Sequence, residues 1–262
     1  MEWDLNWRLK IKMRLLFILL HLLLFACRVT NEQSKIAVLI SANAEWKVVK
    51  SFYPEENYQS TPWGEYFSKE LLTANGKVPI LFFHEGWGKV AAAGATQYAI
   101  DRWNPEILIN LGTCGGFEGL VNRYEILLID RTIIYDIKEA MGDSKGAIAD
   151  YSTDIDLSWL NYPDTLRKTV LVSADRDLVP EEIEVLKKDY QAIAGDWETG
   201  AIAYTCGRNN KKLLAIRGVT DLVNNQRGEA YGNPTVFENG TEIVMKKLLT
   251  DLPSWVAAVA KD

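Results

Sequence analysis

The sequence predicts an α/β fold with three layers, in which helices cover both faces of a central mixed, largely parallel sheet. Mostly apolar runs of strand length, typical of strands buried on both faces, recur at residues 36–40, 80–83, 107–111, 169–172 and 213–219. Segments compatible with helices lie between or after these runs, at residues 90–100, 181–188, 202–210 and 235–249. Alternation of strands and helices is the pattern of a parallel sheet covered by helices.

Local signals mark where several of these elements begin and end. The helix at residues 90–100 is rich in alanine and follows a Gly-Trp-Gly-Lys turn, and Asn104-Pro105 ends it before the next strand. Residues 124–135 alternate as strands do. Pro180 begins an amphipathic helix whose charged residues we expect on a solvent-exposed face.

Length and composition limit the classes of protein to consider. A chain of 262 residues with 48% hydrophobic composition fits one large domain, which we place at residues 35–262. The formal net charge of −6 is a poor match for nucleic acid or for an anionic membrane surface, so we expect neither as a partner. Three cysteines and two histidines give neither a disulfide framework nor a zinc-ligand spacing, so we expect no metal and no cofactor.

The first 27 residues have the pattern of a signal peptide or a lipoprotein leader. Basic residues precede the run at 15–26, which is apolar apart from His21 and too short to span a bilayer comfortably. Residues 24–27 resemble a lipoprotein cleavage box that ends at Cys27. We expect an exported protein that is secreted, periplasmic or lipid-anchored through Cys27. A start at Met13 keeps the signal, whereas a mis-assigned leader would leave a cytoplasmic protein, and a membrane-peripheral helix is a further alternative.

Polar or glycine-rich turns follow four of the predicted strands. They are residues 41–45, 112–116, 173–177 and 220–221. Because the carboxyl ends of parallel strands meet at one edge of a sheet, these turns are expected to converge on one ligand pocket.

Two short stretches carry the chemistry that such a pocket needs. They read Asp196-Trp197-Glu198-Thr199-Gly200-Ala201 and Arg217-Gly218-Val219-Thr220-Asp221. Carboxylates at the end of a strand can orient hydroxyl groups or exchange protons, and a tryptophan between two of them can pack on a flat or ring-shaped substrate. A solvated loop with one core tryptophan is the alternative interpretation.

These two stretches resemble the signatures of the nucleoside phosphorylase and nucleosidase superfamily, and within it the methylthioadenosine and S-adenosylhomocysteine nucleosidases. The resemblance covers roughly residues 36–249 and implies the phosphorylase/hydrolase-like α/β/α fold. The run Gly86-Trp87-Gly88-Lys89 and the alanines after it are similar to a run in the same nucleosidases. Related nucleosidases are commonly dimers, so a homodimer is expected.

The resemblance implies a role for each matching residue. Asp221 is expected to protonate the purine, and Glu45 to activate the attacking water, although a first-turn helix acid is an equally good interpretation of Glu45. Glu198 would accept the ribose hydroxyl groups and Trp197 would pack on the substrate. The remaining substrate-binding candidates are Asp196, Thr113, Gly115, Thr220 and Asp175.

The sequence departs from the family in one respect that bears on the base. Asp177 stands where the family has an aromatic residue that stacks on the purine. Either the base differs, or stacking is expected from Trp87, from Trp197 or from the aromatic residues of 136–164. This polar segment has little periodicity, and we expect a loop-rich cover over the pocket, with surface packing as the alternative for each of its aromatic residues.

The sequence favours water over phosphate as the nucleophile. Phosphorylases of the superfamily are expected to have a phosphate-binding arginine near the first turn, and no arginine lies between Arg28 and Arg102. A glycine-rich turn at a helix start, as at residues 86–88, can bind an anion but more often allows tight packing. We therefore expect hydrolysis of a purine nucleoside, with a phosphate-dependent phosphorylase or a non-catalytic secreted nucleoside-binding protein as the alternatives.

Overall fold

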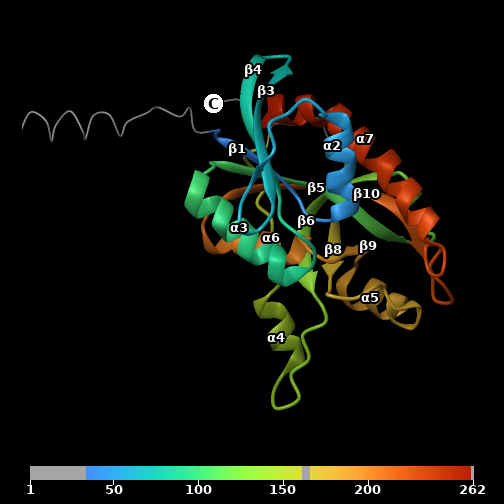
Figure 1. Ribbon diagram of the computed structural model, residues 1–262. Helices are drawn as coiled ribbons and strands as arrows, with labels where there is room; N and C mark the ends of the chain where they lie inside the picture. Colours follow the sequence, from blue (N-terminus) through green and yellow to red (C-terminus); the bar gives the residue numbers. More distant parts are fainter. Residues whose placement is uncertain (1–33, 161–165, 261–262) are drawn as a thin grey trace, which may run out of the picture. The chain divides into compact units, whose positions relative to one another are not determined.

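The computed structural model describes residues 34–160 and 166–260, which belong to the unit at residues 34–262 (Figure 1). The predicted leader and Cys27 lie outside the described residues, as does Tyr162 of the polar segment. None of the helices within the described ranges has both the length and the apolar composition needed to cross a membrane.

The centre of the sheet is built from parallel strands, as the sequence predicts. Strand β1 (Ile36–Ile40) pairs with β4 (Gly76–His84) on one side and with β5 (Ile107–Phe117) on the other. On its far side β5 pairs in parallel with β10 (Lys212–Val223). Beyond β4 the sheet continues with the antiparallel strands β3 (Glu65–Thr73) and β2 (Gln59–Ser60).

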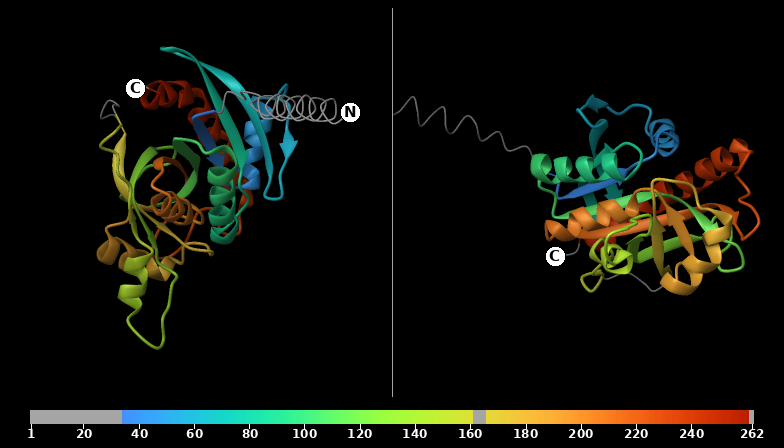
Figure 2. Two further views of the ribbon diagram at one scale, coloured as in Figure 1. Left: turned by 90° about the vertical axis from the view of Figure 1, so that its left-hand side faces the viewer. Right: turned by 90° about the horizontal axis from the view of Figure 1, so that it is seen from below.

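The other half of the ten-stranded sheet closes on itself. Strands β6 (Ile126–Ile134), β8 (Arg167–Ser173) and β9 (Ala194–Asp196) complete the ring β5–β9–β8–β6–β10–β5. Closure is possible because β10 is long enough to pair with β5 along most of its length and with β6 across residues 215–218. The curl of these strands is visible in the left view of Figure 2. The short strand β7 (Thr153–Asp154) pairs in antiparallel orientation with residues 131–132 of β6.

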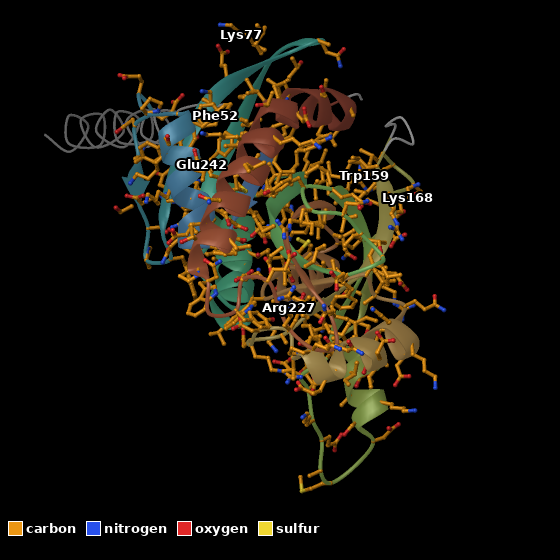
Figure 3. The ribbon with its side chains drawn as sticks, turned by 90° about the vertical axis from the view of Figure 1, so that its right-hand side faces the viewer. Phe52, Lys77, Trp159, Lys168, Arg227 and Glu242 are labelled. Carbon is orange, nitrogen blue, oxygen red and sulfur yellow. The ribbon has the colours of Figure 1, made fainter. Side chains whose placement is uncertain are left out.

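Two helical layers cover the sheet and confirm the predicted α/β/α arrangement. Helices α2 (Asn43–Phe52) and α7 (Pro234–Val259) pack side by side on one face, where Phe52 and Glu242 are labelled in Figure 3. Helices α3 (Lys89–Trp103) and α6 (Thr199–Arg208) pack against each other on the other face (Figure 1). Alternate residues of β1 enter the two cores: Val38 packs with α7 and Leu39 with α3. Each side chain is fully buried, which explains why the strand is apolar throughout.

Two small helices complete the fold. Helix α5 (Ile183–Tyr190) follows a single 3₁₀ turn (Pro180–Glu182) and buries Ile183 and Leu186 against a third, smaller core. Helix α4 (Ser144–Asp150) and the loop before it extend away from the sheet in Figure 1.

The structure corrects three boundaries. Residues 220–221 do not follow a strand, since they lie inside β10, which continues to Val223. Residues 112–116 are not a turn: they continue β5, because β10 runs beside them and pairs with each position up to Phe117. Helix α7 continues ten residues beyond the predicted end at 249 and contains Pro253. Its buried residues, including Leu252 and Trp255, pack on the core and hold the helix together where the proline removes one hydrogen bond.

Candidate active site

A cavity of about 450 Å³ opens where β1, β5, β9 and β10 end. Of the predicted site residues, all except Asp175 line it. The full lining consists of Ala42, Asn43, Ala44, Glu45, Trp87, Thr113, Cys114, Gly115, Arg176, Asp177, Leu178, Gly195, Asp196, Trp197, Glu198, Thr220, Asp221, Val223, Ala230, Tyr231, Pro234 and Phe237.

Glu45 lies in the first turn of α2 and is 3% exposed. Its Oε1 accepts hydrogen bonds from the backbone N–H of Thr113 at 2.6 Å and from the Thr113 hydroxyl at 2.8 Å. Its Oε2 accepts one hydrogen bond from the backbone N–H of Ala42 at 3.1 Å, which leaves this oxygen free to accept another. Burial raises the pKa of Glu45, while Arg217 and the Thr113 hydrogen bonds lower it. The side chain is therefore more than a helix-capping acid.

Arg217 is the functional residue that the sequence analysis missed. It is 1% exposed within β10, and its Nε donates to Asp196 Oδ2 at 3.0 Å and to Thr199 Oγ1 at 2.7 Å. Its Nη2 donates to Asn110 Oδ1 at 2.6 Å. The sequence contains a signal for this residue, because Arg217 stands within the predicted apolar strand at 213–219, and an arginine in a buried strand must find a buried partner.

Gly112 makes room for this arginine. A Cβ atom at Gly112 would lie 1.9 Å from Arg217 Nη1 and 2.8 Å from Glu45 Oε1. Distances this short are incompatible with a side chain, so the glycine allows a guanidinium and a carboxylate to approach the same point. The positive charge of Arg217 thereby acts on Glu45 without forming a salt bridge to it within the described structure.

The Asp196 carboxylate is hydrogen-bonded to other residues of the protein. Besides Arg217, its carboxylate accepts the Ser173 hydroxyl at 2.6 Å and both the hydroxyl and the backbone N–H of Thr199. These bonds fix the turn from β9 into α6. We therefore expect Asp196 to shape the cavity wall, while the adjoining Trp197 and Glu198 face the ligand.

Glu198 is the residue of this turn whose carboxyl group has hydrogen-bonding capacity left. It is 7% exposed, and its Oε1 accepts a hydrogen bond from the backbone N–H of Gly88 at 2.9 Å. Burial, together with the charges of Asp196 and Glu45, raises the pKa of Glu198 to about 8. Its Oε2 is available to ligand hydroxyl groups.

Asp221 is turned into the cavity by a β-bulge. The register of β10 against β5 shifts between Val219 and Asp221, so Thr220 is the extra residue. The Thr220 hydroxyl donates to Asp221 Oδ1 at 2.6 Å and leaves Oδ2 without a protein partner in the described structure. Asp221 is 6% exposed, and burial is the main cause that raises its pKa. This is the environment in which a carboxylic acid can retain a proton near neutral pH.

Aromatic side chains frame the cavity mouth. Trp197 and Trp87 stack with ring centroids 4.7 Å apart, and Trp87 is 62% exposed. Tyr231 comes from the loop between β10 and α7, in which Arg227 is labelled in Figure 3, and its hydroxyl donates to the Leu178 carbonyl. Phe237 on α7 also lines the cavity.

The expected cover by residues 136–164 is wrong for the described part of that segment. Neither Tyr151 nor Trp159 lines the cavity: Tyr151 packs on Tyr204, and the Trp159 ring lies under the Lys212 ammonium group. The β10–α7 loop and the stacked tryptophans line the cavity instead. Asp177 does line the cavity, as its position in the sequence suggests, but its side chain is exposed.

The substrate-binding role predicted for Asp175 does not fit its position. Its Oδ1 accepts the backbone N–H of Lys89 at 2.7 Å, at the start of α3, and the residue lies outside the cavity lining. The neighbouring N–H of Gly88 is bound to Glu198. The glycine-rich turn before α3, with Gly86 and Gly88 at positive φ, therefore binds the protein's own carboxylates.

Acidic side chains predominate among the ionisable residues of the cavity lining. The described lining contains five carboxylates, and its single basic side chain, Arg176, is paired with Glu182. Cys114 lines the cavity too, but burial raises the pKa of its thiol, so the thiolate that a cysteine nucleophile requires is disfavoured. Among the described residues no group of three or more His, Cys, Asp or Glu side chains could hold a metal ion.

A family profile described as the phosphorylase superfamily matches residues 35–248. The chain belongs to the phosphorylase superfamily. A superfamily member from Thermotoga maritima, a 5′-methylthioadenosine/S-adenosylhomocysteine nucleosidase, is 32% identical over 146 residues, which are 55% of this chain and 66% of the relative. The nucleosidase of the same description from Tolumonas auensis is 25% identical over 81% of this chain and 94% of its own length.

The superfamily fold extends to solved structures. The methylthioadenosine/S-adenosylhomocysteine nucleosidase of Streptococcus pneumoniae in complex with 8-aminoadenine superposes with a TM-score of 0.68 at 15% identity. The superposition covers 85% of this chain and 99% of that one. The fold implied by the resemblance is thereby confirmed.

Proposed function

We propose that the protein hydrolyses the N-glycosidic bond of a purine nucleoside, of the kind that methylthioadenosine and S-adenosylhomocysteine represent, and releases free base and sugar. The observation that carries this proposal is the convergence of three carboxyl groups on one cavity: Glu45 from the first turn of α2, Glu198 from the residues after β9, and Asp221 from the bulge in β10. Breaking this bond requires an acid for the departing base, a stabilised oxocarbenium-like sugar, and a water molecule on the opposite face. The nucleosidase relatives support the same chemistry.

Asp221 is the proposed acid. The electron pair of the C1′–N9 bond leaves with the purine, and a proton from Asp221 neutralises the charge that develops on the base. The Thr220 hydroxyl holds Oδ1, so Oδ2 is the oxygen that would carry this proton. Burial raises the pKa of Asp221, which favours its protonated form relative to that of an exposed aspartate.

Glu198 and Glu45 are proposed to act on the sugar and on the water. Ribose hydroxyl groups would bond to Glu198, while the Gly88 N–H holds the other oxygen in place. Water would bond to the free position on Glu45 Oε2, lose a proton to that carboxylate and form the new C1′–O bond. Thr113 fixes Glu45 through two hydrogen bonds, which limits the motion of the base during transfer.

Two observations favour water over phosphate. Five acidic side chains and no unpaired basic side chain would face a phosphate dianion in the described lining, so no side chain there offers it a counter-charge. The backbone N–H groups of Gly88 and Lys89, which would otherwise suit an anion, already bind Glu198 and Asp175. The Lys89 ammonium group is paired with Asp136.

The test is base release from methylthioadenosine, adenosine, inosine and uridine, each with and without phosphate. We expect release from a purine nucleoside at the same rate in both conditions. Strictly phosphate-dependent release would make the protein a phosphorylase. Binding without release would make it a non-catalytic nucleoside-binding protein.

We further propose that the enzyme is exported, through a signal peptide or a lipid anchor on Cys27, that it serves purine salvage, and that it is a homodimer. The basic flank and apolar run of residues 1–27 support export, and the family resemblance supports the dimer. The intact mass of the mature protein tests the first point, because retention of residues 1–27 would contradict it. Light scattering of the purified protein tests the homodimer.

A further inference from the structure

Glu85 is a fully buried carboxyl group that the mechanism above does not use. It follows the last residue of β4, is 0% exposed, and its backbone N–H donates to the Ile40 carbonyl at 2.8 Å. The Thr96 hydroxyl of α3 donates to Oε1 at 2.7 Å, and Ser41 Oγ lies 3.4 Å from Oε2. Within the described structure Glu85 forms no salt bridge, so both partners of its carboxyl group are neutral hydroxyls.

The two segments on either side of Glu85 hold the two carboxylates that face the sugar. Ser41 begins the turn that ends at Glu45, whose Oε2 is bonded to Ala42. Residues 86–88 follow Glu85 directly, and the Gly88 N–H holds Glu198. A single buried side chain thus joins the turn after β1 to the turn before α3.

We propose that Glu85 is a positioning residue of the proposed hydrolase, and that it acts as a neutral carboxylic acid that donates its proton to Ser41 Oγ and accepts the Thr96 hydroxyl. In this form it fixes both turns while adding no charge beside Glu45. The inference rests on the proposed function, and it assigns a role to a residue that does not touch the substrate.

The surroundings of Glu85 favour the neutral form. Burial raises its pKa to about 8, and the negative charge of Glu45 on α2 acts in the same direction. The hydroxyls of Thr96 and Ser41 and the positive charge of Arg217 on β10 lower it. The Arg217 guanidinium group is itself paired with Asp196. On α6 the facing titratable group is the Cys206 thiol, whose pKa is raised by burial first and also by Glu85.

Ionisation of Glu85 would have two consequences. It would remove the donor to Ser41, and it would place a negative charge near Glu45, the carboxylate that must accept the water proton. The protein should therefore lose activity and stability as the pH rises through the Glu85 pKa.

The test compares Glu85→Gln and Glu85→Ala with the unchanged protein, and uses the exposed Glu70→Gln as the matched control. The amide of glutamine can accept from Thr96 and donate to Ser41 at every pH. At pH 6 to 7 we expect the kcat of Glu85→Gln to lie within about twofold of that of the unchanged protein. Between pH 7 and 9 we expect the ratio of the two kcat values, variant over unchanged protein, to rise by about tenfold. We expect Glu85→Ala to lower kcat by ~10–100-fold with a smaller change in KM.

Several results would overturn the proposal. A kcat of Glu85→Ala equal to that of the unchanged protein would remove the positioning role. A loss in Glu85→Gln as large as in Glu85→Ala would show that the charge is needed. An unchanged protein that releases no base would contradict the proposed function, and the positioning role with it.

Urea unfolding decides the protonation state without any assay of activity. A carboxyl whose pKa is raised by folding stabilises the protein fully below its unfolded pKa, and this contribution is lost as the pH rises through the folded value. The urea midpoint of the unchanged protein should therefore fall relative to that of Glu85→Gln between pH 5 and 9. A constant difference over this range would refute the neutral carboxylic acid even if the enzyme is active.

Discussion

Replacing Asp221 by asparagine removes the proposed acid with little change of shape. Asparagine keeps an oxygen that can accept the Thr220 hydroxyl, which now bonds Asp221 Oδ1 at 2.6 Å. Its amide nitrogen can still donate a hydrogen bond to a purine, but it cannot transfer the proton. We therefore expect the variant to fold normally and to bind nucleoside, and to lose turnover.

The size of the loss follows from the position of the residue. General acid catalysis contributes ~10²–10⁴-fold to a rate, or about 3–5 kcal/mol of transition-state stabilisation. Asp221 is 6% exposed and lies beside the bulge at Thr220, so bulk water is poorly placed to supply the proton instead. The loss in kcat should then lie in the upper part of this range, at ~10³–10⁴-fold.

The assay is steady-state base release from methylthioadenosine over pH 5 to 9, with Asp150→Asn, an exposed position on α4, as the control. Burial raises the pKa of Asp221, and the protonated form is the active one, so kcat should fall on the alkaline side. In Asp221→Asn, the part of the alkaline decrease in kcat that comes from deprotonation of Asp221 should be absent. A variant with kcat within tenfold of the unchanged protein would refute the role of Asp221 as the acid.

The remaining predictions concern the groups around the sugar and the wall behind them. Glu45→Gln should lower kcat for base release by ~10²-fold with a smaller effect on KM, because the amide cannot take the water proton. Equal effects on kcat and KM would contradict the role of Glu45. Arg217→Met should lower the free energy of unfolding by about 3–5 kcal/mol in urea, because it leaves Asp196 buried and unpaired, whereas the exposed Arg131→Met should change it little. Gly112→Ala should cost about 1–3 kcal/mol in the same measurement, since its Cβ would lie 1.9 Å from Arg217 Nη1; a neutral effect would contradict the tight packing.

The central parallel strands could be predicted from the sequence because burial on both faces leaves a plain pattern. Each residue of β1 is buried, alternately against α7 and α3, and so the strand is an uninterrupted apolar run. The long hairpin partner β3 carries exposed polar residues such as Ser68, and its two-faced pattern was not recognised. The closure of the ring through β10 depends on long-range pairing with β6, which no local pattern encodes.

The residues that line the cavity could be predicted more completely than the buried residues that hold them in place. The ends of parallel strands meet at one edge of a sheet, so Glu45 and Asp221 could be placed together before their contacts were known, and the family resemblance of residues 196–201 added Glu198. The partners of buried charges depend on three-dimensional packing, and Arg217 and Glu85 were therefore missed. Asp175 likewise accepts a hydrogen bond from the first residue of α3, Lys89, instead of contacting a ligand. Its position in the sequence does not distinguish these two roles.

The claim that water attacks C1′ is tested most directly by identifying the sugar product. The enzyme would be incubated with methylthioadenosine and excess phosphate, and the sugar analysed by mass spectrometry. The acidic cavity, in which the described lining offers phosphate no unpaired basic side chain, predicts the free sugar in both the presence and the absence of phosphate. Formation of the sugar 1-phosphate would contradict the account and would mean that phosphate reaches the carbon that we assign to water.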